Sequence, residues 1–174
     1  MGDFLVQLIS ALILALGMSP IWPLGPNPLP GDPFVIVNKQ TNQIAFINEN
    51  RVKTIVSVGT GKKADLTPEG IFTVTIKAVN PYYRKKNIFG GNPQNPLGTR
   101  WIGFDAKETD GRIFGLHGTN QPDTIGHYVS QGCVRLQNEK IEFLYDLIPL
   151  GTKIFIVNST KNFHELAREA GAIK

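Results

Sequence analysis

The chain has 174 residues, of which 41% are hydrophobic, 18 are glycine and 12 are proline. This length accommodates one packed domain, and the abundance of turn-forming residues favours short strands over a helical bundle. The formal net charge of +4 suits a polyanionic setting such as a cell wall or an anionic membrane surface. No long basic block with an aromatic stacking platform is present, which argues against a nucleic-acid partner.

The first 17 residues predict export or membrane anchoring. Residues 4–16, FLVQLISALILAL, are long enough for the core of a signal peptide but shorter than the about 20 residues that span a bilayer. Asp3 stands where a signal peptide usually carries basic residues, and Ala15-Leu16-Gly17 is only a fair cleavage site. Residues 1–17 are therefore predicted to be either a signal peptide or an uncleaved N-terminal anchor.

The next segment, residues 18–33, is rich in Pro and Gly and is predicted to be a linker. From residue 34 the sequence changes to short runs rich in Val, Ile, Phe and Thr with an alternating pattern, which predicts strands. We expect these strands over residues 34–38, 43–48, 52–58, 71–79, 100–104, 112–117 and 153–157. Turn-like breaks between the early runs indicate hairpins, so the first half of the domain is expected to form an antiparallel meander.

Residues 80–99 show no periodic pattern, and a connection of this length is typical of a lid or binding loop. Its apolar side chains, Tyr82, Tyr83, Ile88 and Phe89, are expected to find a packing partner, which argues against a disordered insertion. A helix is predicted over residues 138–148, with apolar residues at helical spacing and Asn138 as its N-cap. The polar tail, residues 159–174, is expected to contain one short surface helix.

The only cysteine, Cys133, lies near two of the three histidines. Composition alone favours a buried, inert sulfur, because an isolated cysteine usually behaves as a small apolar side chain. A thiol attacks a carbonyl carbon as the thiolate, so a reactive cysteine needs a base or a positive electrostatic environment. His117 ends a predicted strand and is rigidly held, so we expect it to be the base. His127 is assigned to a loop near the site, and His164 receives no role.

Three residues around Cys133 add to this pattern. Gly132 permits a backbone shape closed to other residues, so the amides of Gly132 and Cys133 can both point toward a developing oxyanion. Ser130 is a candidate to hydrogen-bond the imidazole or the substrate, although a simple turn role explains it equally well. Arg135 shares the face of the thiol if the segment is extended. It either holds a carboxylate and raises the local potential, or forms a structural salt bridge.

The wording of this segment resembles a known family. HGT, a short loop and SQGCVRLQNEKIEFL closely resemble the signature of the L,D-transpeptidase catalytic domain of the YkuD type. That signature is written H-G-T, a short loop, then S/T-x-G-C-I/V-R-M/L-x-N. VGTGKKADLTPEGIFTV and NPLGTRWIGF resemble the same family, and the resemblance covers about residues 34–158, which we take as the catalytic domain.

The resemblance implies a fold and a set of site residues. The expected fold is mainly β with one or two short helices, a mixed β-sandwich or flattened barrel. Cys133 matches the nucleophile and His117 the residue that accepts and donates the proton. The Gly118 carbonyl matches the group that holds the imidazole, and the other matched positions are the oxyanion-binding amides of Gly132 and Cys133 and the flanking Ser130 and Arg135.

The activity implied is peptidoglycan L,D-transpeptidation. A thioester forms on the third residue of a tetrapeptide stem, D-alanine leaves, and an amine of a neighbouring stem takes the acyl group to give a 3-3 cross-link. The resemblance also implies a cofactor-independent, monomeric enzyme at the wall or the extracellular face of a bacterial membrane. The alternatives are a wall-acting cysteine peptidase such as an L,D-carboxypeptidase, and an exported wall-binding β-domain with an inert cysteine. A papain-like order would place cysteine before histidine, and a sortase has longer separations.

Overall fold

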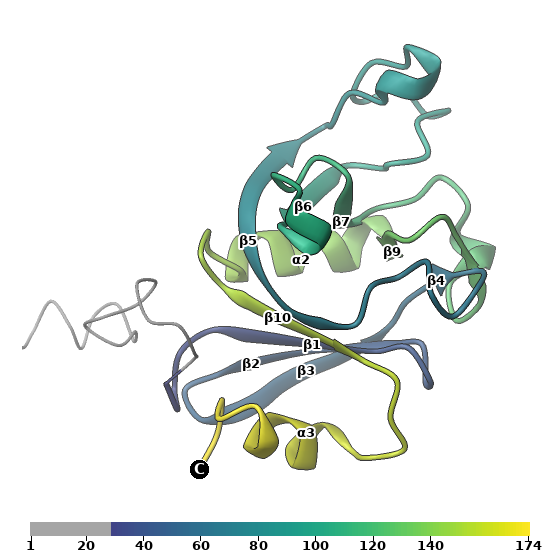
Figure 1. Ribbon diagram of the computed structural model, residues 1–174. Coiled ribbons are helices and arrows are strands. Elements are labelled where there is room, and N and C mark those ends of the chain that lie inside the picture. Colours follow the sequence, from purple (N-terminus) through teal and green to yellow (C-terminus); the bar gives the residue numbers. More distant parts are fainter. Residues whose placement is uncertain (1–28) are drawn as a thin grey trace, which may run out of the picture.

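The computed structural model describes residues 29–174, so the predicted signal or anchor segment and most of the predicted linker lie outside the described residues. The described chain is built on one curled sheet of eight strands (Figure 1). In spatial order these are β3 (Arg51–Ser57), β2 (Gln43–Asn48), β1 (Phe34–Asn38), β10 (Lys153–Val157), β5 (Gly70–Val79), β6 (Arg100–Phe104), β7 (Phe114–His117) and β9 (Val134–Arg135). The short strands β4 (Thr60–Gly61) and β8 (Tyr128–Ser130) form a second, two-stranded sheet.

The predicted fold class is confirmed, because the described chain is mainly β with two α-helices, α2 (Asn138–Leu147) and α3 (Phe163–Glu169). Three short 3-10 turns, Arg84–Lys86, Ala106–Glu108 and Pro122–Thr124, complete the described elements. All seven predicted strands and both predicted helices are present, with ends that shift by one or two residues. The alternation of large apolar and polar residues was therefore a sufficient signal for the longer strands, whereas the two- and three-residue strands β4, β8 and β9 were not predicted.

The predicted meander is only partly correct. β1, β2 and β3 pair antiparallel in sequence order, but β5 does not join β3. Instead β10 enters between β1 and β5, parallel to β1 and antiparallel to β5. β5 then pairs with β6 along its second half, with a shift of register between Val74 and Ile76. A bulge of this kind bends a strand, and Figure 1 shows β5 sweeping from the lower half of the sheet to the upper half.

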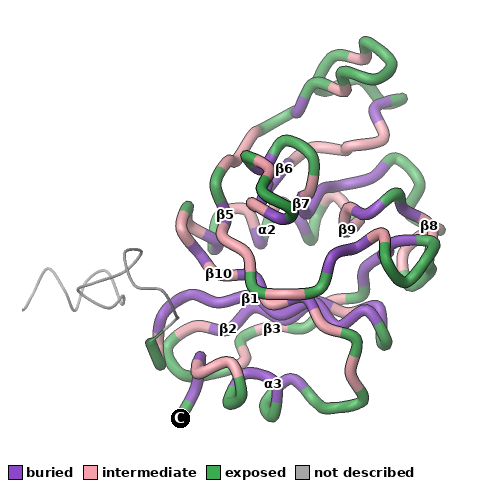
Figure 2. Tube along the Cα trace, viewed as in Figure 1, coloured by how far each residue is buried: buried purple, intermediate pink, exposed green. Residues whose placement is uncertain are grey.

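Two apolar layers hold the sheet in place (Figure 2). On one side, Ile141 and Leu144 of α2 join a cluster that includes Leu116 of β7 and Val134 of β9, all of them almost completely buried. On the other side, α3 covers β1 and β2 through a separate cluster that contains Phe34. The first layer fixes β7, which ends in His117, and β9, which directly follows Cys133. The packing of α2 therefore determines where the site lies.

Residues 80–99 form a lobe that projects from the upper end of the sheet (Figure 1). Asn95 is buried at its base and donates Nδ2–H bonds to the carbonyls of Pro81, at 2.8 Å, and Phe89, at 3.2 Å. The rings of Tyr82 and Phe89 contact each other in a tilted arrangement with centroids 5.5 Å apart, but the two residues stay 44% and 72% exposed. The two aromatic side chains thus find a packing partner, as expected, but the partner of each is the other ring.

Within residues 29–174 no helix has both the length and the apolar character that crossing a bilayer requires.

Candidate active site

His117 ends β7 and is 5% exposed. Its Nδ1 lies 2.5 Å from the carbonyl oxygen of Gly118. Because a carbonyl oxygen only accepts hydrogen bonds, Nδ1 carries the proton and Nε2 keeps its lone pair. The Gly118 carbonyl therefore fixes both the orientation and the tautomer of the imidazole, and leaves Nε2 as the basic nitrogen.

The surroundings of His117 keep it neutral. The pKa of His117 is lowered from 6.5 to about 4, mainly by burial and to a smaller extent by the positive charge of Arg135, while hydrogen bonds with the backbone of Gly118 and Leu97 oppose the shift. Loss of hydration penalises the charged form of a buried imidazole, which explains the direction of the main effect. The imidazole is therefore a free base at neutral pH.

Cys133 directly precedes β9, which pairs in parallel with β7 so that His117 lies opposite Arg135 and Leu116 opposite Val134. Extending this register by one residue sets Cys133 beside Gly115. Since side chains alternate between faces, Cys133, Arg135 and His117 share one face of the sheet. The thiol lies 3.4 Å from the Ile113 carbonyl, and burial raises the pKa of Cys133 from 9.0 to about 11 against smaller opposing effects.

The turn before Cys133 is braced by Ser130. Its Oγ donates to the Cys133 carbonyl at 2.6 Å and accepts the N–H of Gly132 at 3.0 Å. Gly132 has φ of +131°, and a Cβ there would lie 2.6 Å from the Leu66 carbonyl oxygen, so only glycine fits. Of the roles considered for Ser130, the turn role is the one with a visible contact. The Gly132 N–H assigned to the oxyanion already donates to Ser130.

Arg135 points along the same face as Cys133 and His117 and is half-buried. Its Nη1 makes a long contact of 3.5 Å to the side-chain oxygen of Gln121, and its Nε is buried with no hydrogen-bond partner among residues 29–174. No carboxylate of these residues forms an ion pair with it, so the structural salt bridge considered above is absent from the described part. The guanidinium retains unused donors beside the thiol.

Asn138 has a role that the sequence reasoning missed. It is the first residue of α2 rather than its N-cap; Gln137 occupies the cap position and makes no side-chain capping bond. The Asn138 Oδ1 instead accepts the N–H groups of Thr99, at 3.3 Å, and Thr119, at 3.2 Å. One amide oxygen thus connects the end of the lobe to the residue after Gly118. The asparagine at the end of the quoted signature was the available signal, but its capping role was the simpler interpretation.

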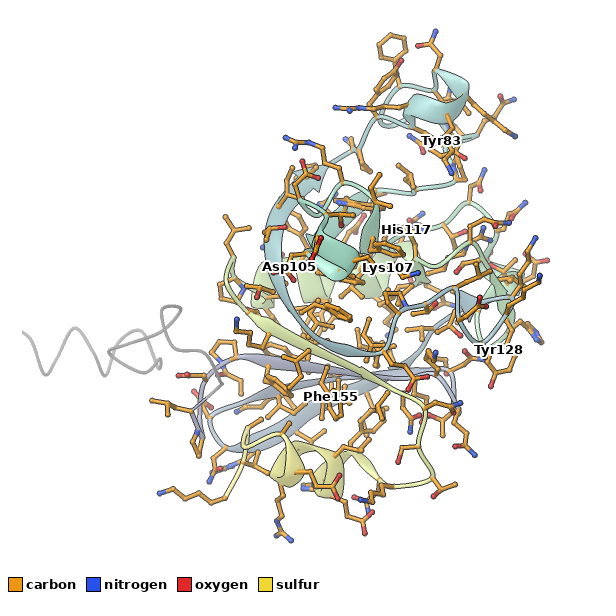
Figure 3. The ribbon with its side chains drawn as sticks, in the orientation of Figure 1. Tyr83, Asp105, Lys107, His117, Tyr128 and Phe155 are labelled. Atoms are coloured by element: carbon orange, nitrogen blue, oxygen red, sulfur yellow. The ribbon has the colours of Figure 1, made fainter. Side chains whose placement is uncertain are left out.

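Trp101 is a second residue that the sequence reasoning passed over. It lies opposite His117 in the β6–β7 pair, and the two rings stack with centroids 5.7 Å apart. It appeared only within the stretch NPLGTRWIGF, in which no position was given a role. Figure 3 shows His117 in the upper half of the molecule, below the lobe that carries Tyr83.

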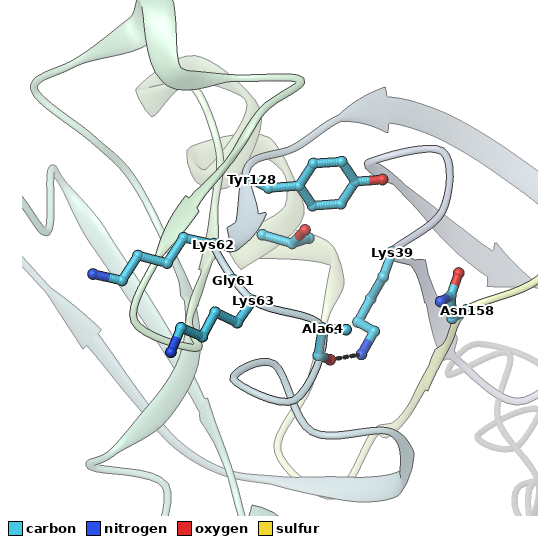
Figure 4. A pocket seen from close by; sticks show the side chains of 8 residues that line it. Lys39, Gly61, Lys62, Lys63, Ala64, Tyr128 and Asn158 are labelled. Atoms are coloured by element: carbon cyan, nitrogen blue, oxygen red, sulfur yellow. Dashed lines mark hydrogen bonds between the residues drawn. The ribbon is translucent and has the colours of Figure 1, made fainter.

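A pocket of about 330 Å³ lies beside β4 and β8 and contains neither Cys133 nor His117 (Figure 4). Its buried Lys39 donates to the carbonyls of Ala64 and Thr67 and pairs with Glu69 at 2.8 Å. The side chains of Lys62 and Lys63 point away from Lys39 in Figure 4. Lys39 therefore ties residues 62–69, the segment that backs Gly132, to the end of β1.

The remaining histidines lie apart from this arrangement. His127 is exposed in the turn before β8, and His164 is exposed on α3. Residues 29–174 contain no group of three or more histidine, cysteine or carboxylate side chains arranged to hold a metal ion. The site thus consists of a thiol, a neutral imidazole with a fixed tautomer, and a guanidinium on one sheet face.

Comparisons with known proteins give relatives that are named as L,D-transpeptidases. The relative named "Putative L,D-transpeptidase YqjB" from Bacillus subtilis (strain 168) is 60% identical over 156 residues, covering 90% of this chain and 89% of the relative. Another from the same strain, "Putative L,D-transpeptidase YkuD", is 29% identical over 143 residues, covering 82% of this chain and 77% of the relative.

Solved structures share the fold at lower identity. The L,D-transpeptidase (Yku) from Stackebrandtia nassauensis matches with a TM-score of 0.59 and 19% identity, covering 78% of this chain and 60% of that one. The catalytic domain of the E. faecium L,D-transpeptidase matches with a TM-score of 0.56 and 20% identity, covering 73% and 98%. This chain spans 51% of another match, the Ldtfm–avibactam carbamoyl enzyme.

The family model described as the L,D-transpeptidase catalytic domain (YkuD) matches residues 32–156. These residues include all the strands of the sheet, except for the last residue of β10, and the whole of the site described above. The chain therefore belongs to the L,D-transpeptidase catalytic domain family.

Proposed function

We propose that this protein is a peptidoglycan L,D-transpeptidase in which Cys133 is the nucleophile and His117 the general base and acid. The observation that carries the proposal is the hydrogen bond between His117 Nδ1 and the Gly118 carbonyl, on the sheet face that also bears Cys133. Because Nδ1 carries its proton in this bond, Nε2 is the only ring nitrogen that can accept one. Membership of the family supplies the reaction class, acyl transfer between stem peptides.

The resting site holds a neutral thiol and a neutral imidazole, since the pKa of Cys133 is about 11 and that of His117 about 4. In the first half-reaction Nε2 takes the Sγ proton as sulfur attacks the carbonyl of the third stem residue. The resulting imidazolium gives this proton to the nitrogen of the terminal D-alanine, which leaves as the thioester forms. In the second half-reaction Nε2 takes a proton from the acceptor amine, the amide forms, and the sulfur recovers a proton from the imidazolium.

Three groups are assigned to the charges of the substrate, namely the N–H groups of Cys133 and Gly132 and the guanidinium of Arg135. The Cys133 N–H donates to the developing oxyanion, and the Gly132 N–H joins it when Ser130 Oγ turns to the Cys133 carbonyl alone. The unused N–H groups of Arg135 donate hydrogen bonds to a carboxylate of the stem that supplies the acyl group, because a guanidinium matches the planar geometry of a carboxylate. The substrate thereby completes the hydrogen bonding that the free site lacks.

The location follows the same reasoning. A transpeptidase of this class acts where peptidoglycan stems lie, so residues 1–17 are proposed to direct the chain out of the cell or to anchor it there. The positive net charge of +4 suits the polyanionic wall. We propose a monomer, because one chain supplies every residue assigned here.

The test is turnover by the purified full chain of a tetrapeptide donor, with diaminopimelate-type amines and with water as acceptors, read by product mass. A cross-linked product with release of D-alanine supports transpeptidation, whereas D-alanine release with a shortened stem alone indicates an L,D-carboxypeptidase. Cys133→Ala and His117→Ala should abolish turnover while retaining the circular dichroism spectrum, and His127→Ala, in an exposed loop, is the matched control. Near-normal turnover by Cys133→Ala would overturn the nucleophile assignment, whereas no turnover by the wild-type chain with any acceptor would favour the non-catalytic wall-binding alternative.

A further inference from the structure

We infer that Trp101 is a positioning residue for His117, and that Gly115 leaves the room that its indole ring occupies. The inference rests on the proposed function only where the rate of acylation is concerned. Trp101 lies directly opposite His117 in the antiparallel β6–β7 pair, and the two rings stack with centroids 5.7 Å apart and planes 16° apart. Cross-strand partners on one face are close enough for such ring contacts.

The indole is held in one orientation. Trp101 is 8% exposed, and its Nε1–H donates to the Gly111 carbonyl at 2.9 Å. A buried indole N–H that finds its partner fixes both the plane and the direction of the ring. The imidazole is therefore constrained twice, by the Gly118 carbonyl at Nδ1 and by the indole beside its face.

Glycines beside the indole ring are needed for this orientation of Trp101. A Cβ at Gly115 would lie 2.6 Å from Cζ2 of Trp101. A Cβ at Gly103 would lie 1.8 Å from the Gly111 carbonyl oxygen that accepts the indole N–H, and 2.6 Å from Nε1 of Trp101. Gly111, which supplies the carbonyl for the indole, has φ of +88°. Real Cβ atoms do not approach other atoms so closely, so any side chain at Gly103 or Gly115 displaces the indole.

The indole also reaches toward the part of β7 that lies beside Cys133. Gly115 is the β7 residue beside Cys133 in the β7–β9 register, and the indole edge lies over it. Trp101 therefore excludes water from the imidazole, which contributes to the desolvation that lowers the pKa of His117.

The experiment compares Trp101→Leu, Trp101→Phe and a control, Phe34→Leu, in the full chain. Phe34 is fully buried in the cluster under α3, away from the site, so its variant reports general destabilisation. The readouts are the pKa of His117 by NMR of the imidazole nitrogens and the rate constant for acylation of Cys133 by a carbapenem. The first does not depend on any enzymatic activity, so its outcome is separable from a failure of the proposed function.

We expect Trp101→Leu to raise the pKa of His117 from about 4 toward 6.5 and to slow acylation by about 100-fold, the scale of a misplacement of about 1 Å. Trp101→Phe, which keeps a ring but loses the bond to Gly111, should shift both in the same direction by less. Phe34→Leu should change neither. If folded Trp101→Leu keeps the His117 pKa at about 4 and acylates within about threefold of wild type, the inference is wrong. Should that variant not fold, Trp101→Phe with both readouts unchanged overturns it equally.

Discussion

The neutral state of buried His117 predicts a specific loss of stability in mild acid. In the folded chain the pKa of His117 is lowered from 6.5 to about 4, mainly by burial. Between these two pH values the imidazole is protonated in the unfolded chain and neutral in the folded chain. The unfolded chain therefore binds more protons, so the free energy of unfolding falls as the pH drops through this window and recovers as the pH rises above it.

The magnitude follows from the same two pKa values. They differ by about 2.5, and each pKa unit corresponds to about 1.4 kcal/mol, so His117 alone should remove about 3 kcal/mol between neutral pH and pH 4. That is a large share of the roughly 5–15 kcal/mol that stabilises a typical domain. A protein of this size should therefore show a visible change in its urea midpoint.

The assay is urea unfolding followed by circular dichroism at a series of pH values for wild type and His117→Gln. Carboxylates titrate in the same range in both proteins, so the difference between their pH profiles isolates His117. The His117→Gln profile should be flatter by about 3 kcal/mol. His127→Gln, which replaces an exposed histidine, should keep the steep profile. Parallel profiles for wild type and His117→Gln would refute the reasoning.

Three further predictions concern Lys85, Asn138 and Ser130, which act on Cys133 or on the segments around it. Lys85→Gln should slow alkylation of Cys133 by iodoacetamide about twofold at low salt, because the Lys85 charge lowers the thiol pKa, whereas Lys86→Gln should leave the rate unchanged. Asn138→Leu should lower the free energy of unfolding by about 2 kcal/mol and slow acylation, because the N–H groups of Thr99 and Thr119 lose their acceptor. Asn138→Asp keeps an acceptor oxygen and should retain both the stability and the acylation rate. Gln137→Ala, measured by the same urea assay, should be neutral. Ser130→Ala should cost about 1–2 kcal/mol through loss of both bracing bonds, and an unchanged thermal midpoint would contradict the turn role.

The sequence was sufficient to predict the local elements and part of the site. Strand alternation located β1, β2, β5 and β10, and the apolar spacing located α2, because both patterns are properties of contiguous residues. The same reasoning placed His117 at a strand end and required glycine at position 132, which the positive φ there explains. These features depend on the chain within a few residues of each position.

Contacts between distant segments could not be predicted in the same way. The entry of β10 between β1 and β5 joins residues from both ends of the domain, and nothing in either strand specifies its neighbour. Asn138 looked like a helix cap because capping is the commonest local use of asparagine, whereas its partners, Thr99 and Thr119, come from two other loops. Trp101 gave no sign that its ring would lie against His117 rather than in the core.

The energetic state of the site has a consequence for its reactivity. Burial opposes charge on both partners, raising the pKa of Cys133 and lowering that of His117, so the resting pair carries neither thiolate nor imidazolium. A neutral thiol reacts slowly with alkylating agents and with oxidants, both of which require the thiolate. A bound substrate offers its carbonyl carbon to the sulfur and its carboxylate to Arg135. The thiol therefore loses its proton to His117 only as the sulfur attacks, and the carboxylate neutralises the positive charge of Arg135 beside the imidazolium that forms. Reactivity that depends on the bound acyl donor therefore follows from desolvation of the two groups.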